Sequence, residues 1–189
     1  MLETEKKLIQ EKIAKSSFCS ETNIPIAIKE LIPFLIIAED RRFYSHRGFD
    51  LTAIIRAALN RLRFGSREGA STIDQQLVRV LTGRYDRNYV RKMKEVLLAY
   101  WLDSHYNKDT IAATYLSLAY YGTEYIGIDA ILSKFRLSIH SHISPKVGAQ
   151  IVARLKYPEP KFEPAKTNKL KIIANRADYI INFYNKTTK

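Results

Sequence analysis

The sequence feature that most constrains the fold is an apolar run that recurs at helical spacing and ends in two adjacent carboxylates. After Pro25, a residue suited to the start of a helix, Ile28, Leu31 and Leu35 return to one side at intervals of three or four residues. This spacing places Glu39 at the end of the helix or just beyond it. Burial of that end would desolvate the carboxylate and raise its proton affinity, so the run predicts a candidate base.

Helical spacing of apolar residues continues through most of the chain, and no strong strand alternation is present. Asp50 is suited to cap one helix, the Ser71-Thr72 pair starts another, and Gly83 marks the break that follows. We therefore expect an all-α fold with a compact helical body. The further expected helices cover residues 2–16, 51–63, 89–106, 107–121, 145–155 and 167–184.

Composition and charge bound the domain organisation and the partners. With 189 residues and 46% hydrophobic content, the chain can bury one sizeable core. We predict a charged helical extension over residues 1–24 and a single domain over residues 25–189. The net charge of +12 attracts nucleic acids, anionic membranes and diphosphate groups alike. Because neither zinc-ligand spacing nor a nucleic-acid recognition motif is present, we expect no nucleic-acid partner.

Three strings concentrate side chains that can do chemistry. Residues 37–50 read IAEDRRFYSHRGFD, residues 69–77 read GASTIDQQL, and residues 91–95 read RKMKE. In this order they resemble the peptidoglycan glycosyltransferase domain of bifunctional penicillin-binding proteins and monofunctional transglycosylases. Two later strings, KDTIAATYLS and YYG, add to a resemblance that covers about residues 32–181.

The resemblance implies a lysozyme-like helical domain with a membrane-facing small lobe, which polymerises lipid II into glycan strands. Glu39 would act as the base that removes the proton from the 4-hydroxyl of the acceptor sugar. That oxygen would attack the anomeric carbon of the donor with inversion and expel a polyprenyl diphosphate. Asp40 is assigned a supporting role, through nearby backbone or arginine groups.

The departing diphosphate requires fixed cations or a metal ion. By resemblance, Arg79 and Arg87 meet the diphosphate, and Arg91, Lys92 and Glu95 form the next motif. On a helix, Glu95 lies four residues after Arg91 and three after Lys92, so it can orient both cations. The resemblance also implies a second catalytic role for Glu95, including help in holding Mg²⁺ or Mn²⁺. The alternative is an ordinary surface ion pair.

Hydroxyl and amide side chains in the second string are suited to orienting sugars and phosphates. The alternative is that they cap a helix and fill polar space in the core. The predicted substrate-binding residues of this string are Ser71, Thr72, Gln75 and Gln76.

Three residues depart from the pattern of the resembled family. Asp74 stands where threonine is usual, Ser117 replaces an asparagine, and Lys156 occupies a position where proline is common. Both candidate glutamates remain. Asp74 could recruit a metal ion, change the choice of acceptor or weaken donor binding, and these alternatives stay open.

The helix expected over residues 51–63 combines an apolar face with arginines, which fits either a solvated surface helix or one lying in a membrane interface. Residues 1–30 contain no apolar stretch long enough to span a membrane. We expect a protein at the outer face of the cytoplasmic membrane, held peripherally or by an anchor outside this chain. Its expected partners are lipid II, the growing glycan strand, the membrane surface and divisome or other cell-wall synthesis proteins.

Two other functions remain open. A degenerate member of the family would bind lipid II or a divisome protein without turnover. A lysozyme-like enzyme would instead cleave glycan, with Glu39 as an acid.

Overall fold

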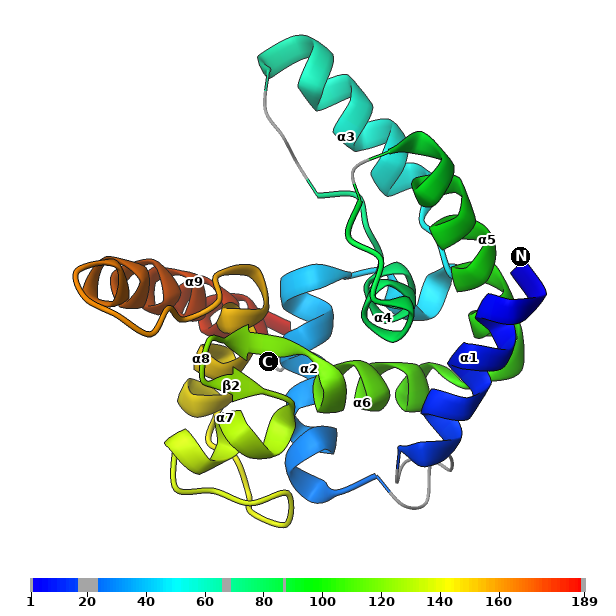
Figure 1. The fold of residues 1–189 in the computed structure, drawn as a ribbon. Helices are drawn as coiled ribbons and strands as arrows, with labels where there is room; N and C mark the ends of the chain where they lie inside the picture. The colour runs from blue at the N-terminus through cyan, green and yellow to red at the C-terminus, as the bar shows by residue number, and fades with distance from the viewer. Residues whose placement is uncertain (1, 17–23, 66–68, 87, 188–189) are drawn as a thin grey trace.

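The computed structural model describes residues 2–16, 24–65, 69–86 and 88–187, and within these ranges the fold is almost entirely helical (Figure 1). This confirms the predicted all-α class. The helices are α1 (Leu2–Lys15), α2 (Ile26–Glu39), α3 (Leu51–Phe64), α4 (Ile73–Thr82), α5 (Tyr89–His105), α6 (Lys108–Leu118), α7 (Ile128–Lys134), α8 (Pro145–Lys156) and α9 (Ala165–Thr187).

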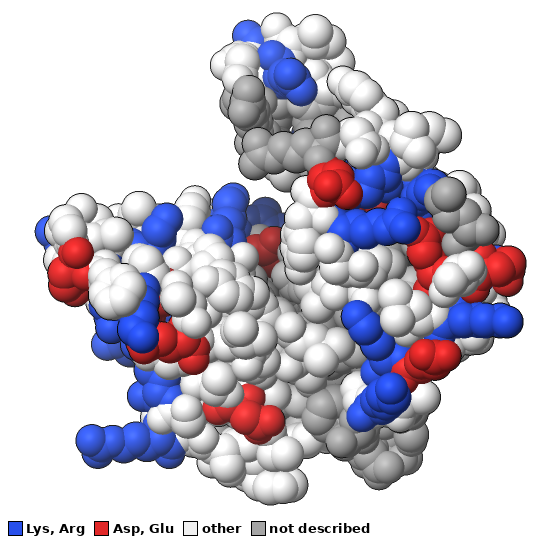
Figure 2. All heavy atoms as spheres, in the orientation of Figure 1, with Lys and Arg blue, Asp and Glu red and all other residues white. Residues whose placement is uncertain are grey.

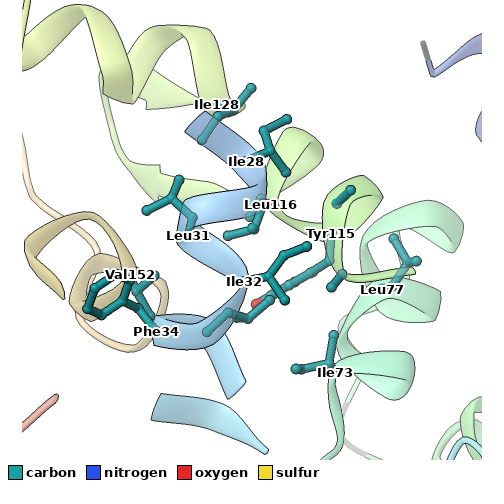
Figure 3. Close-up of a cluster of buried hydrophobic side chains, with 14 of the residues drawn as sticks. Ile28, Leu31, Ile32, Phe34, Ile73, Leu77, Tyr115, Leu116, Ile128 and Val152 are labelled. Carbon is teal, nitrogen blue, oxygen red and sulfur yellow. The ribbon is translucent and has the colours of Figure 1, made fainter. Parts of the chain in front are cut away.

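Helix α2 is the central element of the core. It contacts α6, α8 and α9, and the side chains of Ile28, Leu31 and Leu35 are fully buried. Figure 3 shows part of this core, with Ile28, Leu31 and Ile32 of α2 among side chains that include Leu116 of α6 and Val152 of α8. Each buried side chain of this size stabilises the fold by about 1.5–3 kcal/mol relative to its exposed state. This packing fixes the direction of α2, whose last residue is Glu39.

Helix α1 belongs to the core. It was expected to be a peripheral appendage, but Ile9 and Ile13 are buried where the helix lies against α4 and α5. Glu5 pairs with Arg84 at 2.8 Å, and the Lys12 ammonium donates to the carbonyl of Leu81 at 2.5 Å. The predicted charged helix is present, and its apolar side covers α4 and α5. The domain boundary at residue 24 stays a prediction.

Side-chain caps set the starts of the helices around the site. Asp50 accepts hydrogen bonds from two backbone N–H groups at the start of α3, and Thr72 accepts one from Gln75 at the start of α4. Both caps were predicted from the sequence. Just before the first cap, Gly48 has a φ of +76° and lies so close to α5 that a Cβ there would be 2.4 Å from the carbonyl oxygen of Ala99. The loop before α3 is thereby pressed against α5.

The helix expected over residues 107–121 ends at Leu118, and the chain continues into a two-stranded antiparallel sheet that was not predicted. Its strands are β1 (Tyr120–Gly122) and β2 (Tyr125–Ile126). Backbone pairing with a distant segment explains the change: Glu159 donates its N–H to Tyr121 and accepts from Thr123 through its carbonyl. At Gly122 an added Cβ would lie 2.4 Å from the Glu159 carbonyl oxygen. Helix α7 was also not predicted.

Helix α3 projects away from the body of the molecule (Figure 1). None of its residues is buried, and its apolar side chains are exposed, with Leu62 at 84% and Phe64 at 75%. Within the described ranges, no helix is both long enough and apolar enough to cross a membrane.

Candidate functional site

A cleft of about 540 Å³ lies beside the end of α2. Its walls come from residues 37–42, the segment 69–72 before α4, the end of α8 and the middle of α9. The space-filling view is hollowed between two parts of the molecule, with basic and acidic side chains in the hollow (Figure 2). Elements far apart in the sequence therefore meet around Glu39.

Glu39 lies at the cleft with its carboxylate largely buried. One oxygen, Oε2, accepts a hydrogen bond of 3.1 Å from the Gln76 amide, while Oε1 has no hydrogen-bond partner among the described residues. The Tyr115 hydroxyl donates to the other end of the same amide at 2.6 Å, which turns the Gln76 N–H toward Glu39. Glu39 thus has one oxygen held by Gln76 and one that is buried with its capacity to accept a proton unused.

Burial raises the pKa of Glu39 above the usual range of a glutamate. The Gln76 hydrogen bond opposes this shift, as do the positive charges of Arg176 and Lys156, whereas the Asp40 charge reinforces it. The net direction is the one that a general base needs near neutral pH.

The carboxylate of Asp40 makes structural contacts. Its Oδ2 accepts from the backbone N–H of Ile73 at 3.2 Å and lies 2.9 Å from Nε2 of His46. It therefore links the end of α2 to the first turn of α4, and the carboxylate meets backbone and histidine groups there.

Five basic side chains line the Glu39 cleft: Arg41, Arg42, Arg56, Lys156 and Arg176. The acidic side chains lining it are Glu39, Asp40 and Asp50, and the last caps α3 while lying 3.4 Å from Arg42. Arg176 donates to the carbonyl of Ala38 at 2.6 Å, so α9 is fastened to the last turn of α2. The cleft is thus suited to a ligand with several negative charges.

Glu95 is the centre of a second charged cluster, which adjoins the cleft. Its carboxylate is 3% exposed and accepts from Arg79 at 3.0 and 3.1 Å, from Lys92 at 2.6 Å, and from Arg91. Burial opposes ionisation, but the hydrogen bonds from Arg79 and Lys92 prevail and lower the pKa of Glu95. Three cations around one carboxylate leave the cluster with a positive charge that suits a diphosphate.

The Glu95 cluster does not fit a divalent metal ion. Both carboxylate oxygens are already occupied by Arg79, Arg91 and Lys92, and these three positive charges would repel the ion. The sequence-based expectation of Mg²⁺ or Mn²⁺ at Glu95 therefore has no geometric support here.

The hydroxyl and amide residues of the second string divide into two groups. Ser71 lines the cleft and accepts from the Lys92 ammonium at 3.0 Å. Gln76 contacts Glu39. Thr72 and Gln75 are buried, although Thr72 also borders the cleft: the Thr72 hydroxyl donates to the carbonyl of Gly48, and Gln75 accepts from Lys92 at 2.6 Å. The alternative of capping and polar packing therefore describes the observed contacts of these two.

Helix α4 connects the two charged centres. Gln76 and Arg79 are three residues apart and so lie on one face of the helix, the first reaching Glu39 and the second Glu95. The charges of both centres act on Tyr115. Burial raises the pKa of its hydroxyl, the charge of Glu39 adds to the rise, and the charge of Arg79 opposes it. Two hydrogen-bonded groups, one around Glu39 and one around Glu95, are therefore joined through helix α4.

Some site residues escaped prediction, and one predicted residue cannot be placed. Arg176 and Tyr179 line the cleft from α9, where the sequence shows only an amphipathic helix with scattered polar residues. Lys156 was noted as a departure without a role, and it too lines the cleft. Arg87 lies outside the described residues.

Asp74 does not face the cleft. It is 0% exposed and lies 3.2 Å from the ammonium of Lys108, which also pairs with Asp103. Burial raises the pKa of Asp74 to about 6, although the Lys108 charge opposes the shift. Its negative charge is therefore directed into the core rather than toward a diphosphate in the Glu39 cleft.

The fold and the site define a helical domain built around a desolvated carboxylate in a cationic cleft. A family model described as Transglycosylase matches residues 6–184, so the chain belongs to the transglycosylase family. Proteins named monofunctional glycosyltransferase from Staphylococcus aureus strains JH9 and Newman are 40% identical over 108 residues. The match covers 57% of this chain and 39% of each relative, so it spans less than half of the relatives' length.

Proposed function

We propose that this chain is a peptidoglycan glycosyltransferase that polymerises lipid II into glycan strands. The observation that carries the proposal is the position of Glu39, a carboxylate of raised pKa with one unpartnered oxygen at a cleft lined by five basic side chains. Family membership and the printed names of the relatives support the same reaction.

In the proposed reaction, Glu39 accepts the proton of the acceptor's 4-hydroxyl through Oε1. The resulting oxygen nucleophile forms a bond to the anomeric carbon of the donor sugar, and the bond from that carbon to the diphosphate oxygen breaks. The configuration at the carbon inverts, and the electron pair leaves with the polyprenyl diphosphate. Gln76 holds the other oxygen of Glu39, so the base keeps its orientation while the proton moves.

The leaving diphosphate requires positive charge that is fixed before the reaction begins. The cluster of Arg79, Arg91 and Lys92 supplies it, because Glu95 holds all three side chains and its own pKa is lowered. Glu95 serves in this proposal as a positioning residue for the cations and stays ionised throughout.

We place the reaction at a membrane surface on the outer side of the cytoplasmic membrane. The exposed apolar residues of α3 alternate with arginines, an arrangement suited to acyl chains and anionic headgroups. Divisome or other cell-wall synthesis proteins remain proposed partners, which co-purification from membranes would test.

Incubation with labelled lipid II, followed by separation of the products, tests the reaction. We expect glycan strands from the unchanged protein and a loss of about 10²–10⁴-fold in rate for Glu39→Gln, the range for removal of a general base. Glu124→Gln is the matched control, because Glu124 is exposed on the surface and pairs only loosely with Lys161 at 3.5 Å.

Other products would decide against the proposal. Binding of lipid II without strand formation would identify a degenerate binding protein, and soluble fragments from purified peptidoglycan would identify a glycan-cleaving enzyme. Full polymerising activity in Glu39→Gln, with an unchanged melting temperature, would remove Glu39 from the base role.

A further inference from the structure

A second group of chemically capable side chains lies next to Glu39, and one of its members, Asp40, also lines the cleft. Asp40, His46 and Asp74 each offer one ligand atom, and these three atoms lie within 4.8 Å of one another. The side chains of Asp40 and His46 are each 5% exposed, and Asp74 is fully buried. The group joins three elements: the end of α2, the loop after it and the first turn of α4.

Only one of the two ring nitrogens of His46 has a hydrogen-bond partner among the described residues. Its Nε2 lies 2.9 Å from Asp40, whereas its buried Nδ1 has no hydrogen-bond partner among the described residues. Buried imidazole nitrogens are normally paired, so the unpaired Nδ1 means that the ring of His46 has unused capacity to bind a ligand. Asp40, in turn, is oriented by the backbone N–H of Ile73, as outer-shell donors commonly orient metal-binding carboxylates.

The charges in and around the group favour an added cation. The carboxylates are Asp40 and Asp74 of the group and the adjacent Asp103; Lys108 is the ammonium paired with the last two, and His46 is the partner of Asp40. Lys108 also lies over the ring of Phe43 at 4.5 Å. In this described part of the core, acidic groups therefore outnumber the cation that pairs with them, and buried negative charge calls for compensation by a proton or a metal ion.

We propose that Asp40, His46 and Asp74 form a binding site for a divalent transition-metal ion, Zn²⁺ or Mn²⁺. One imidazole and two carboxylates suit these ions. Ligands of a tetrahedral zinc site stand roughly 3.3 Å apart when the bonds are about 2.0–2.1 Å long, so binding would draw the ligand atoms together by up to about 1.5 Å. The proposal does not depend on the proposed function, because it concerns metal binding and not glycosyl transfer.

The site depends on Asp74, whose carboxylate is fully buried beside Asp40 and His46. It also differs from the Glu95 cluster, where three cations surround one carboxylate. A bound ion would tie Asp40, the neighbour of Glu39, to α4, which carries Gln76. It would thus brace the two elements that hold the candidate base.

Calorimetric titration of the metal-free protein with Zn²⁺ and with Mn²⁺ tests the site. We expect saturable binding of one ion and a higher melting temperature with the ion, reversed by a chelator. Asp74→Thr should weaken binding by at least about 100-fold, more than most losses of an outer-shell partner. Lys108→Met should tighten it, because the ammonium that competes for Asp74 is removed. These two substitutions act in opposite directions on one carboxylate.

Matched controls separate this site from other ligands. The double variant His140→Ala/His142→Ala removes two exposed histidines and should bind as tightly as the unchanged protein. X-ray absorption of the zinc-loaded protein should show nitrogen and oxygen neighbours without sulfur, which excludes the single cysteine.

Three results would overturn the proposal. They are absence of one-to-one binding of either ion, unchanged affinity in both Asp74→Thr and Asp74→Asn, and loss of binding in the surface-histidine variant. Circular dichroism and melting of each variant without metal would show whether it is folded, and Asp74→Asn keeps the size of the side chain should Asp74→Thr fail to fold.

Discussion

At the scale of single residues, Glu39 and Glu95 show how one side-chain type acquires two opposite roles. Glu39 accepts one neutral amide hydrogen bond in a desolvated position, and its pKa is raised. Glu95 is also buried, but it accepts from three cations, and its pKa is lowered. Proton acceptance therefore belongs to Glu39, and the fixing of positive charge belongs to Glu95.

Lys156 allows the environment of Glu39 to be tested by pH. Its charge lowers the raised pKa of Glu39, so Lys156→Gln should raise that pKa further. A base works in its deprotonated form, and activity falls as the pH drops through its pKa. The acid limb of the profile of kcat/KM against pH should therefore move to higher pH in Lys156→Gln.

The control for Lys156 is Lys146→Gln, which removes an exposed lysine from the first turn of the same helix, α8. It should leave the acid limb in place. Because Lys156 is exposed, the shift should also shrink at high ionic strength. An acid limb that is the same in both variants at low salt would show that Lys156 does not influence the base.

Some residues of the candidate site could be predicted from the sequence, and others could not. The string around Glu39 predicted a carboxylate at a helix end, and spacing predicted that Arg91 and Lys92 reach Glu95; the structure shows both. Neither spacing nor residue type indicated that Arg176 lies at the cleft, because α9 reaches it only through tertiary packing. Whether Ser71, Gln76 or Arg79 touches substrate stays a prediction.

At the scale of elements, the starts of helices α3 and α4 could be predicted from neighbouring residues, whereas the two-stranded sheet was not predicted. The caps at Asp50 and Thr72 depend on neighbouring backbone groups, so they could be predicted from adjacent residues. Strand β1 pairs with the neighbouring β2 and is held on its other side by the backbone of Glu159, a distant partner that no local pattern reveals. The same reason explains α1, whose apolar side is buried by helices much later in the chain.

Helix α1 supports a stability prediction. Ile13 is 1% exposed, so Ile13→Ala should lower the free energy of unfolding by about 2–5 kcal/mol, the usual cost of truncating a buried aliphatic side chain. Leu8→Ala, on the exposed side of the same helix, should cost less than about 1 kcal/mol. Denaturant unfolding measures both. Equal and small effects would mean that α1 is only loosely attached.

At the scale of the whole molecule, the charged cleft and the projecting helix α3 suit a reaction on a lipid-linked, anionic substrate. Besides the apolar side chains of α3, Tyr89 and Met93 of α5 are also exposed. Together with a net charge of +12, this surface is suited to an anionic bilayer.

Sedimentation with vesicles tests this surface. The double variant Leu62→Ser/Phe64→Ser should bind anionic vesicles at least about tenfold more weakly, because two large apolar side chains no longer enter the interface. Phe162→Ser, which removes an equally exposed aromatic outside α3, should bind normally. Equal binding by all three proteins would leave charge alone as the cause of attachment.

Helix α4 places Gln76 against Glu39 and Arg79 against Glu95. It therefore sets the distance between the candidate base and the cations proposed to bind the diphosphate. Three residues advance a helix by about 4.5 Å and return nearly to the same side. A single residue inserted between Gln76 and Arg79 would turn one of them about 100° away. The length of this segment is therefore constrained as strictly as the identity of its side chains.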